Sequence, residues 1–156
     1  MGPAGSGKTT AGELLAAHFS WDFFDGDNFH SPANIEKMSH GIPLGDEDRL
    51  PWLHSIREAM LQWDAEGRNI VLACSALKRS YRELLQISSN VRLVYLKGSF
   101  ELFCERLRAR KGHYADEKIL AGQFADLEEP ADAITIDAAL PPQQIVAEIR
   151  ERLALT

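Results

Sequence analysis

The chain opens with the pattern that most restricts how it can fold. Residues 2–9 read GPAGSGKT and match the phosphate-loop pattern G-x-x-x-x-G-K-[ST]. Glycines let the backbone curve so that several N–H groups face one point, where they can bind phosphate oxygens. Such a loop joins a strand to the N-terminus of a helix, whose positive end also favours an anion. The pattern therefore predicts a nucleotide-binding α/β protein.

Individual positions in this loop have separate expected tasks. Lys8 would reach the β- and γ-phosphates of the nucleotide, and the Thr9 hydroxyl would ligate Mg²⁺. A glycine-rich turn before a helix is the alternative interpretation, and the helical pattern that begins at Lys8 favours the phosphate loop. The predicted nucleotide-binding residues are Gly2, Pro3, Ala4, Gly5, Ser6, Gly7, Lys8, Thr9 and Thr10.

The rest of the chain alternates short apolar runs with amphipathic segments, as βαβ units do. We expect strands over Trp21–Phe24, Ile70–Cys74, Val91–Leu96 and Ala133–Ile136. We expect helices over Lys8–Phe19, Pro32–Ser39, from Pro51 to just before Gly67, over Arg79–Gln86, from a Ser99 cap through Arg110, and from Pro141 onward. The predicted fold is a three-layer P-loop NTPase fold, with a parallel sheet flanked by helices, in one domain over residues 1–156.

One element of that fold is missing from the pattern. A phosphate loop normally leaves the end of a buried strand, and only Met1 precedes Gly2 here. We therefore expect the first strand to be absent from this chain, through truncation or a mis-assigned start. A sheet without this central strand should be less stable.

Composition excludes several classes of protein. The 156 residues carry a formal net charge of −6, which disfavours nucleic acid and anionic membranes as partners. No apolar run approaches the roughly 18 residues of a membrane span, and the polar start is unlike a signal peptide.

Cys74 and Cys104 lie in apolar segments without metal-ligand spacing. We expect two reduced core thiols in a cytoplasmic protein.

Two carboxylates follow the first expected strand, in Asp25-Gly26-Asp27. Ligands of parallel α/β sheets bind beyond the carboxyl ends of the strands. One carboxylate there could hold Mg²⁺ through water, and the other could accept the proton of an attacking hydroxyl. Asp-Gly is also a common turn, so the function of this segment depends on the phosphate loop beside it.

Basic residues occur in three further segments. Arg49 could clamp a substrate carboxylate, although a surface Arg–Asp pair is the alternative. Lys78 and Arg82 are four residues apart and could share one helix face near the substrate, or simply be solvated.

The third segment contains Arg106 and Arg110, which spacing puts on one side of a helix. In an acidic protein they resemble a lid that closes over phosphates, at about residues 106–124, rather than a merely solvated face. His113 follows this series, and a lone histidine after glycine is often structural.

Several longer strings make this chain resemble the bacterial-type gluconokinases, a branch of the shikimate- and nucleotide-kinase-like P-loop fold. The strings are MGPAGSGKT, DGDNFH, NIEKM, GIPLGDEDRLPWL, CSALKRSYR, LKGSF, RLRARKGHY and QFADLEEP, which run from Met1 to about Pro130. The resemblance implies ATP-dependent phosphorylation of the 6-hydroxyl of D-gluconate, with Mg²⁺, in a cytoplasmic enzyme that is commonly a homodimer. After Gly112-His113 the chain departs from the family pattern at Tyr114–Glu117, which leaves details of the lid open.

The resemblance also implies roles for individual residues. Asp25 would lie near the metal and Asp27 would act as the base. Arg49 and Arg82 would be anion-binding candidates, and Arg106 and Arg110 would belong to the lid. Apart from the resemblance, Lys78 and His113 are further candidates for substrate binding.

Other functions remain open at this point. The chain could phosphorylate a different small hydroxy acid, such as shikimate, because a fold does not fix a substrate. It could also be a nucleotide-binding switch or ATPase without an acceptor, or a non-functional fragment. The adenine contacts are expected near Asp137–Leu140, where no specific motif occurs.

Overall fold

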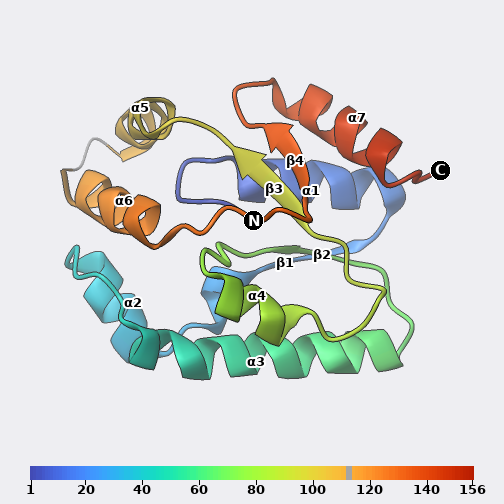
Figure 1. Ribbon diagram of the computed structural model, residues 1–156, viewed down its shortest axis with the longest axis horizontal. Coiled ribbons are helices and arrows are strands. Elements are labelled where there is room, and N and C mark those ends of the chain that lie inside the picture. The colour runs from blue at the N-terminus through green and yellow to red at the C-terminus, as the bar shows by residue number, and fades with distance from the viewer. Residues whose placement is uncertain (112–113) are drawn as a thin grey trace.

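The computed structural model describes residues 1–111 and 114–156 and shows short parallel strands between two groups of helices (Figure 1). The strands are β1 (Asp22–Asp25), β2 (Ile70–Ala73), β3 (Val94–Lys97) and β4 (Ile134–Asp137). The helices are α1 (Lys8–Phe19), the 3-10 turn η1 (Gly26–Phe29), α2 (Pro32–Ser39), α3 (Asp46–Ala65), α4 (Arg79–Leu85), α5 (Phe100–Lys111), α6 (Tyr114–Asp126) and α7 (Pro142–Arg152). The expected alternation of strands and helices is confirmed.

The strands form two parallel pairs. β1 pairs with β2, with Asp25 opposite Ala73, and β3 pairs with β4, with Lys97 opposite Asp137. In the part of the chain that the structure describes, β2 and β3 are not paired with each other.

The N-terminal backbone lies between these two pairs. Met1 donates from its amino group to the Val94 carbonyl at 2.5 Å and accepts from the Leu96 N–H at 3.0 Å. Gly2 donates to the Ser75 carbonyl, just beyond β2, at 3.3 Å. The start of the phosphate loop is therefore bonded to both half-sheets.

Two apolar clusters hold the helices against the strands. Helices α1 and α7 pack together and cover one side, and α3 and α4 cover the other side (Figure 1). The first cluster contains Leu15, Leu96 and Ile149 among its buried members, and the second is centred on Leu53 and Ile56, which are fully buried. The phosphate loop and the ends of β1 and β2 lie where the two layers meet.

Some boundaries differ from the prediction. α3 begins at Asp46, not after Pro51, because three acidic residues stand in its first turn and the Asp48 carboxylate accepts from the Gly45 N–H at 2.9 Å. This stabilisation of the helix N-terminus is larger than the cost of the backbone hydrogen bond that is lost because Pro51 has no N–H. β3 begins at Val94 because the Val91 N–H is used in a turn to the Ser88 carbonyl.

Leu53→Ala tests the second cluster. Leu53 is fully buried, so the truncation should cost about 2–5 kcal/mol of the free energy of unfolding, from lost transfer energy and the cavity left behind. Urea unfolding followed by circular dichroism measures this cost. The matched control is Leu61→Ala on the same helix, where 45% of the side chain is exposed and little change is expected. Equal effects of the two substitutions would contradict the assigned core.

Candidate active site

The phosphate loop adopts a curved backbone that specific glycines permit. Gly5 and Gly7 have φ angles of 80° and 91°, in the left-handed region that other residues rarely occupy. A Cβ atom on Gly5 would also lie 2.9 Å from the Phe103 carbonyl oxygen. Lys8, the first residue of α1, folds back over the loop and donates from Nζ to the Pro3 carbonyl at 3.0 Å. The lysine and the loop thus form one unit at the N-terminus of α1.

The structure brings together the two residues predicted to hold a metal. Thr9 Oγ1 donates to Asp25 Oδ2 at 3.0 Å, and Asp25 Oδ1 accepts from the Asp27 N–H at 2.9 Å. Mg²⁺ prefers oxygen ligands and takes few of them from protein in phosphate-binding sites, so a hydroxyl and a carboxylate fit it. No cluster of three or more His, Cys, Asp or Glu suited to a metal occurs within residues 1–111 and 114–156.

The carboxyl of Asp27 and the ammonium of Lys8 influence each other. Desolvation raises the pKa of Asp27, the negative charge of Asp25 raises it further, and Lys8 opposes both. Desolvation lowers the pKa of Lys8, although Asp27 and Asp25 favour its charged form. A carboxyl with a raised pKa is a better proton acceptor, which is the property that a general base needs.

A small pocket of about 130 Å³ opens beside these groups. Its walls come from the phosphate loop, the end of β1, the segment between α2 and α3, and α6. Its polar lining includes Lys8, Asp27, His30, Arg49, Gln123 and Asp126. The predicted base and the predicted anion clamp therefore face the same cavity.

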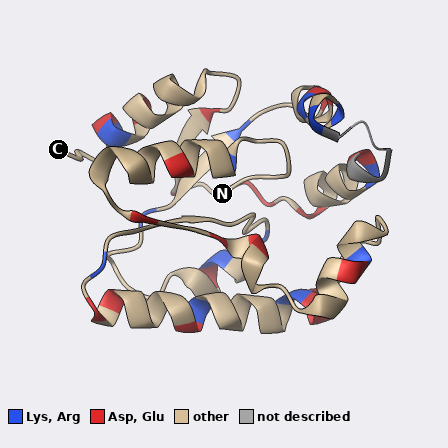
Figure 2. Ribbon diagram, turned by 180° about the vertical axis from the view of Figure 1, so that it is seen from behind, with Lys and Arg blue, Asp and Glu red and all other residues tan. Residues whose placement is uncertain are grey.

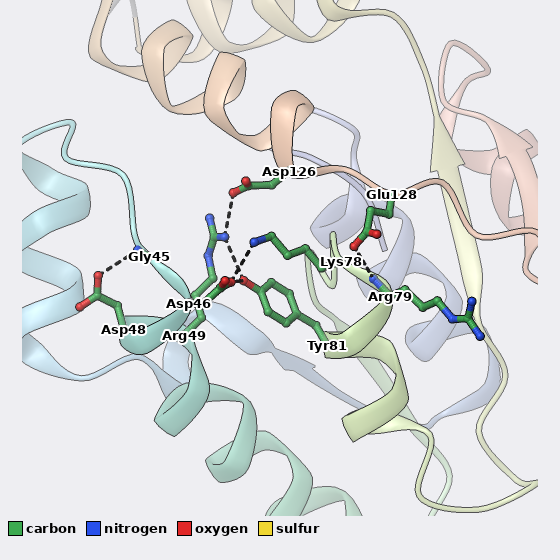
Figure 3. Close-up of polar contacts among 9 residues, drawn as sticks. All are labelled: Gly45, Asp46, Asp48, Arg49, Lys78, Arg79, Tyr81, Asp126 and Glu128. Carbon is green, nitrogen blue, oxygen red and sulfur yellow. Dashed lines mark hydrogen bonds and ion pairs between the residues drawn. The ribbon is translucent and has the colours of Figure 1, made fainter.

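Arg49 is held at this pocket by two partners (Figure 3). Its guanidinium donates to Asp126 Oδ2 at 2.8 Å and to the Tyr81 hydroxyl at 3.2 Å, and only 12% of its side chain is exposed. The Tyr81 hydroxyl donates in turn to the Asp46 carboxylate, which also pairs with Lys78 at 2.9 Å. This network joins the start of α3, the start of α4 and the end of α6.

The structure places Lys78 and Arg82, which their spacing allowed to share one helix face, in two different sets of contacts. Lys78 precedes α4 and pairs with Asp46, as Figure 3 shows. Arg82 donates to the carbonyls of Ala76 and Leu77 at 2.9 Å each and to that of Glu128 at 2.7 Å. These bonds tie the segment after β2 to the segment after α6, and neither basic residue lines the small pocket.

The two arginines that were predicted to form a lid lie on α5, whose basic residues are visible in Figure 2. Arg106 donates to the Gly5 carbonyl at 3.3 Å and to the Ala138 carbonyl at 2.5 Å. It therefore connects the phosphate loop with the segment where adenine contacts were predicted. Arg110 is exposed, and its charge helps to lower the pKa of Lys8. His113 lies outside the described residues.

Sequence reasoning missed three residues of this site. The Ala4 N–H in the phosphate loop donates to Gln123 Oε1 at 2.7 Å, and Asp126 one turn later holds Arg49. His30 lines the pocket and stacks on Trp52, with ring centroids 4.3 Å apart. The sequence signal that could have found Gln123 and Asp126 is their spacing of three residues. This spacing puts two side chains on one face of a helix, so it is informative after α6 has been identified as a helix.

Trp52 combines packing with a polar contact. It is buried, as expected for an aromatic side chain, and its Nε1–H donates to the Gly26 carbonyl at 2.7 Å. This bond fixes the turn between Asp25 and Asp27.

A phosphate loop at the N-terminus of α1, two carboxylates at the end of β1 and a small polar pocket between them define the class of P-loop kinases. A model of the family described as shikimate kinase matches residues 4–154. The thermoresistant gluconokinase of Escherichia coli K12 is 39% identical, with 97% of this chain and 89% of that protein covered. The chain belongs to the gluconokinase family, within the wider group that the shikimate kinase model describes.

Solved structures agree with this assignment. An unliganded sugar kinase from Janibacter sp. HTCC2649 matches with a TM-score of 0.91 and 39% identity, over 100% of this chain and 92% of that one. A gluconokinase from Sinorhizobium meliloti 1021 matches with a TM-score of 0.84 and 39% identity, over 99% and 93%. None of the helices in the described ranges combines the length and apolar character needed to cross a bilayer.

His30 should make stability depend on pH. Burial, aided by the charge of Arg49, lowers its pKa from the ordinary 6.5 to about 4. Between these values the unfolded chain binds more protons than the folded one, so stability falls as pH drops from 7 towards 4. His30→Phe keeps an aromatic ring against Trp52 but cannot be protonated, so its unfolding free energy should fall less between pH 7 and pH 5.

Urea unfolding at the two pH values measures this difference. The control is His54→Phe, which changes an exposed histidine on α3 and should retain the wild-type loss. An equal loss in wild type and His30→Phe would show that His30 is not responsible.

Proposed function

We propose that this protein is a gluconokinase, which transfers the γ-phosphoryl group of ATP to the 6-hydroxyl of D-gluconate. The observation that carries the proposal is the small pocket in which the Asp27 carboxylate, Lys8 of the phosphate loop and the Arg49 guanidinium meet. The named gluconokinases that align over nearly the whole chain support gluconate as the acceptor.

The reaction needs a base, a phosphate site and a binding site for the acid. Asp27 would accept the proton of the 6-hydroxyl while that oxygen forms a bond to the γ-phosphorus, and the bond to the bridging oxygen breaks to release ADP. Lys8, the loop amides and the lid arginines Arg106 and Arg110 would stabilise the negative charge of the phosphoryl group. Thr9 and Asp25 would hold Mg²⁺, which supplies further neutralisation of phosphate charge when bound.

Arg49 would bind the gluconate carboxylate. Its guanidinium already binds one carboxylate, that of Asp126, at 2.8 Å within the pocket. A substrate carboxylate could take that place without leaving the arginine unpaired, and the bidentate geometry of Arg suits this exchange. Lys78, Arg82 and His113 stay weaker predictions for substrate binding, since the described contacts of the first two lie outside the pocket.

The wider setting also remains proposed. We propose one kinase domain over residues 1–156 with a lid at about residues 106–124. The family resemblance supports a cytoplasmic homodimer that uses ATP and Mg²⁺. The net charge of −6 supports a protein that binds neither nucleic acid nor membrane.

A panel of acceptors separates this proposal from its alternatives. ADP release from Mg-ATP should rise strongly with D-gluconate and little with shikimate. A rise with shikimate or another hydroxy acid instead would move the assignment to that acceptor. Slow hydrolysis that no acceptor changes would favour a nucleotide switch.

Lys8→Ala should reduce gluconate-dependent ADP release by about 10²-fold or more, because a preorganised cation at the transferring phosphoryl group is lost. Circular dichroism should show an unchanged fold. The control is Lys118→Ala, which removes an exposed lysine from α6 and should keep wild-type turnover. Full activity of Lys8→Ala would overturn the phosphate site.

Asp27→Asn should lower kcat by about 10²–10⁴-fold, since the amide cannot accept the proton. The affinity for ATP, measured by calorimetry, should change far less because the phosphate loop is intact. Asp132→Asn, at an exposed position between α6 and β4, is the matched control. Unchanged kcat in Asp27→Asn would exclude it as the base.

A further inference from the structure

His30 lines the small pocket, and the proposed reaction gives it no task. Its ring stacks on Trp52, with ring centroids 4.3 Å apart and 13° between the ring planes. The backbone N–H of His30 donates to the Asp27 carbonyl at 3.3 Å, so the ring belongs to the turn that carries the proposed base. The imidazole is therefore held in one orientation beside the groups that would bind the acceptor.

Asn34 determines which ring nitrogen of His30 carries the proton. The Asn34 side chain is buried, and its Nδ2 lies 2.8 Å from the Asp48 carbonyl oxygen and 3.3 Å from His30 Nδ1. A carbonyl oxygen can only accept, so the amide nitrogen of Asn34 must be the atom at this place. One Asn34 N–H goes to the carbonyl and the other to His30 Nδ1, which accepts. A neutral imidazole in this arrangement carries its proton on Nε2.

The Nε2–H of His30 is a neutral donor that a ligand can use. Burial, aided by the charge of Arg49, lowers the pKa of His30 to about 4, so the ring is uncharged near pH 7. Within residues 1–111 and 114–156, Nε2 has no hydrogen-bond partner. Asn34 does not line the pocket, so the Nδ1 edge of the ring faces away from the cavity and the Nε2 edge is the polar edge left for it.

Other uncharged polar side chains of the lining are less suited to this task. Trp52 and Gln123 already bond to backbone groups, the Gly26 carbonyl and the Ala4 N–H. Ser75 also lines the pocket, but a hydroxyl donor can rotate, whereas the His30 ring is held by its two neighbours. His30 is therefore the preorganised neutral donor of the pocket.

Under the proposed function, the acceptor has to span this pocket. Its terminal hydroxyl would lie at Asp27 and its carboxylate at Arg49, and both residues line the same cavity as His30. The carbons between these two ends of D-gluconate carry secondary hydroxyls, whose oxygens can accept from a neutral donor. A site with such a donor rejects analogues without the hydroxyl, because its own N–H is then left unpaired.

We propose that the Nε2–H of His30 donates to one secondary hydroxyl of the acceptor and so selects polyhydroxy acids over simple hydroxy acids. The assignment rests on the proposed function and extends it to the oxygens between the two ends of the acceptor. Asn34 supports this role, since its amide holds the ring in the tautomer that can donate.

Deoxy analogues of D-gluconate, each with one secondary hydroxyl replaced by hydrogen, test the assignment. His30→Phe keeps a ring against Trp52 but removes the donor. Its kcat/KM for D-gluconate should fall by about 10-fold, mainly through KM, while KM for ATP stays unchanged. One analogue should lose a similar factor with wild type and lose nothing further with His30→Phe, because the hydrogen bond is already absent. The matched control is His54→Phe, at an exposed position on α3, which should keep wild-type values with every acceptor.

The outcomes separate this assignment from a structural role of His30 and from failure of the proposed function. Unchanged kcat/KM of His30→Phe for D-gluconate would overturn the assignment. The same loss with D-gluconate and with every deoxy analogue would show a structural role and also overturn it. Wild type that does not phosphorylate D-gluconate would overturn the proposed function, and this assignment with it.

A second measurement needs neither a variant nor turnover. Two-bond ¹H–¹⁵N correlation spectra of the wild-type protein at pH 7 distinguish the two neutral tautomers of a histidine. His30 should show the Nε2–H form, and saturating D-gluconate should shift its Nε2 resonance. The Nδ1–H form, or an Nε2 resonance that D-gluconate leaves unchanged, would overturn the assignment.

Discussion

The hydrogen bonds of Met1 and Gly2 join two halves of a sheet that are otherwise separate, and the position of the phosphate loop depends on them. Met1 bonds to Val94 and Leu96, and Gly2 bonds to Ser75. A Cβ atom at Gly2 would lie 2.8 Å from Ser6 Oγ and 3.0 Å from the Leu96 carbonyl, so glycine is required at this crossing. The phosphate loop follows directly, and it places Lys8 and Thr9 near the ends of β1 and β2. A shift of one half-sheet against the other would therefore misplace the loop relative to the Asp25 and Asp27 carboxylates.

Much of this catalytic centre could be predicted because its residues are close in sequence to the elements that place them. Lys8 and Thr9 begin α1, whose bounds were predicted to the residue, and Asp25 ends β1. The rule that ligands gather at the carboxyl ends of parallel strands then brings these side chains together. The Thr9–Asp25 hydrogen bond at 3.0 Å is the contact that this reasoning requires.

The remainder depends on contacts between distant segments, which spacing does not reveal. The sequence around Arg82 is compatible with a substrate-binding arginine. In the structure its guanidinium instead donates to backbone carbonyls, those of Ala76 before it and Glu128 after it in the sequence. Gln123 and Asp126 lie in the string QFADLEEP, whose spacing indicates no chemistry, and they gain a role because Gln123 of α6 bonds to the phosphate loop and Asp126 bonds to Arg49. Likewise α3 begins at Asp46, before the predicted start at Pro51, because the Asp48 carboxylate accepts a hydrogen bond from the Gly45 N–H. The preference of proline for the first turn of a helix does not take this stabilisation into account.

The Arg49–Asp126 pair gives the site a connection between its acceptor side and its phosphate side. Charges with so little exposure are costly to leave unpaired, so Arg49 needs a carboxylate whether or not a substrate is bound. Asp126 lies one turn after Gln123, which holds the Ala4 N–H of the phosphate loop. Under the proposed function, a substrate carboxylate that replaced Asp126 would release the end of α6 and, through Gln123, affect a loop amide. Acceptor binding and phosphate binding would then be coupled through one helix, and the pocket would favour small acids over neutral sugars because a neutral acceptor could not replace Asp126.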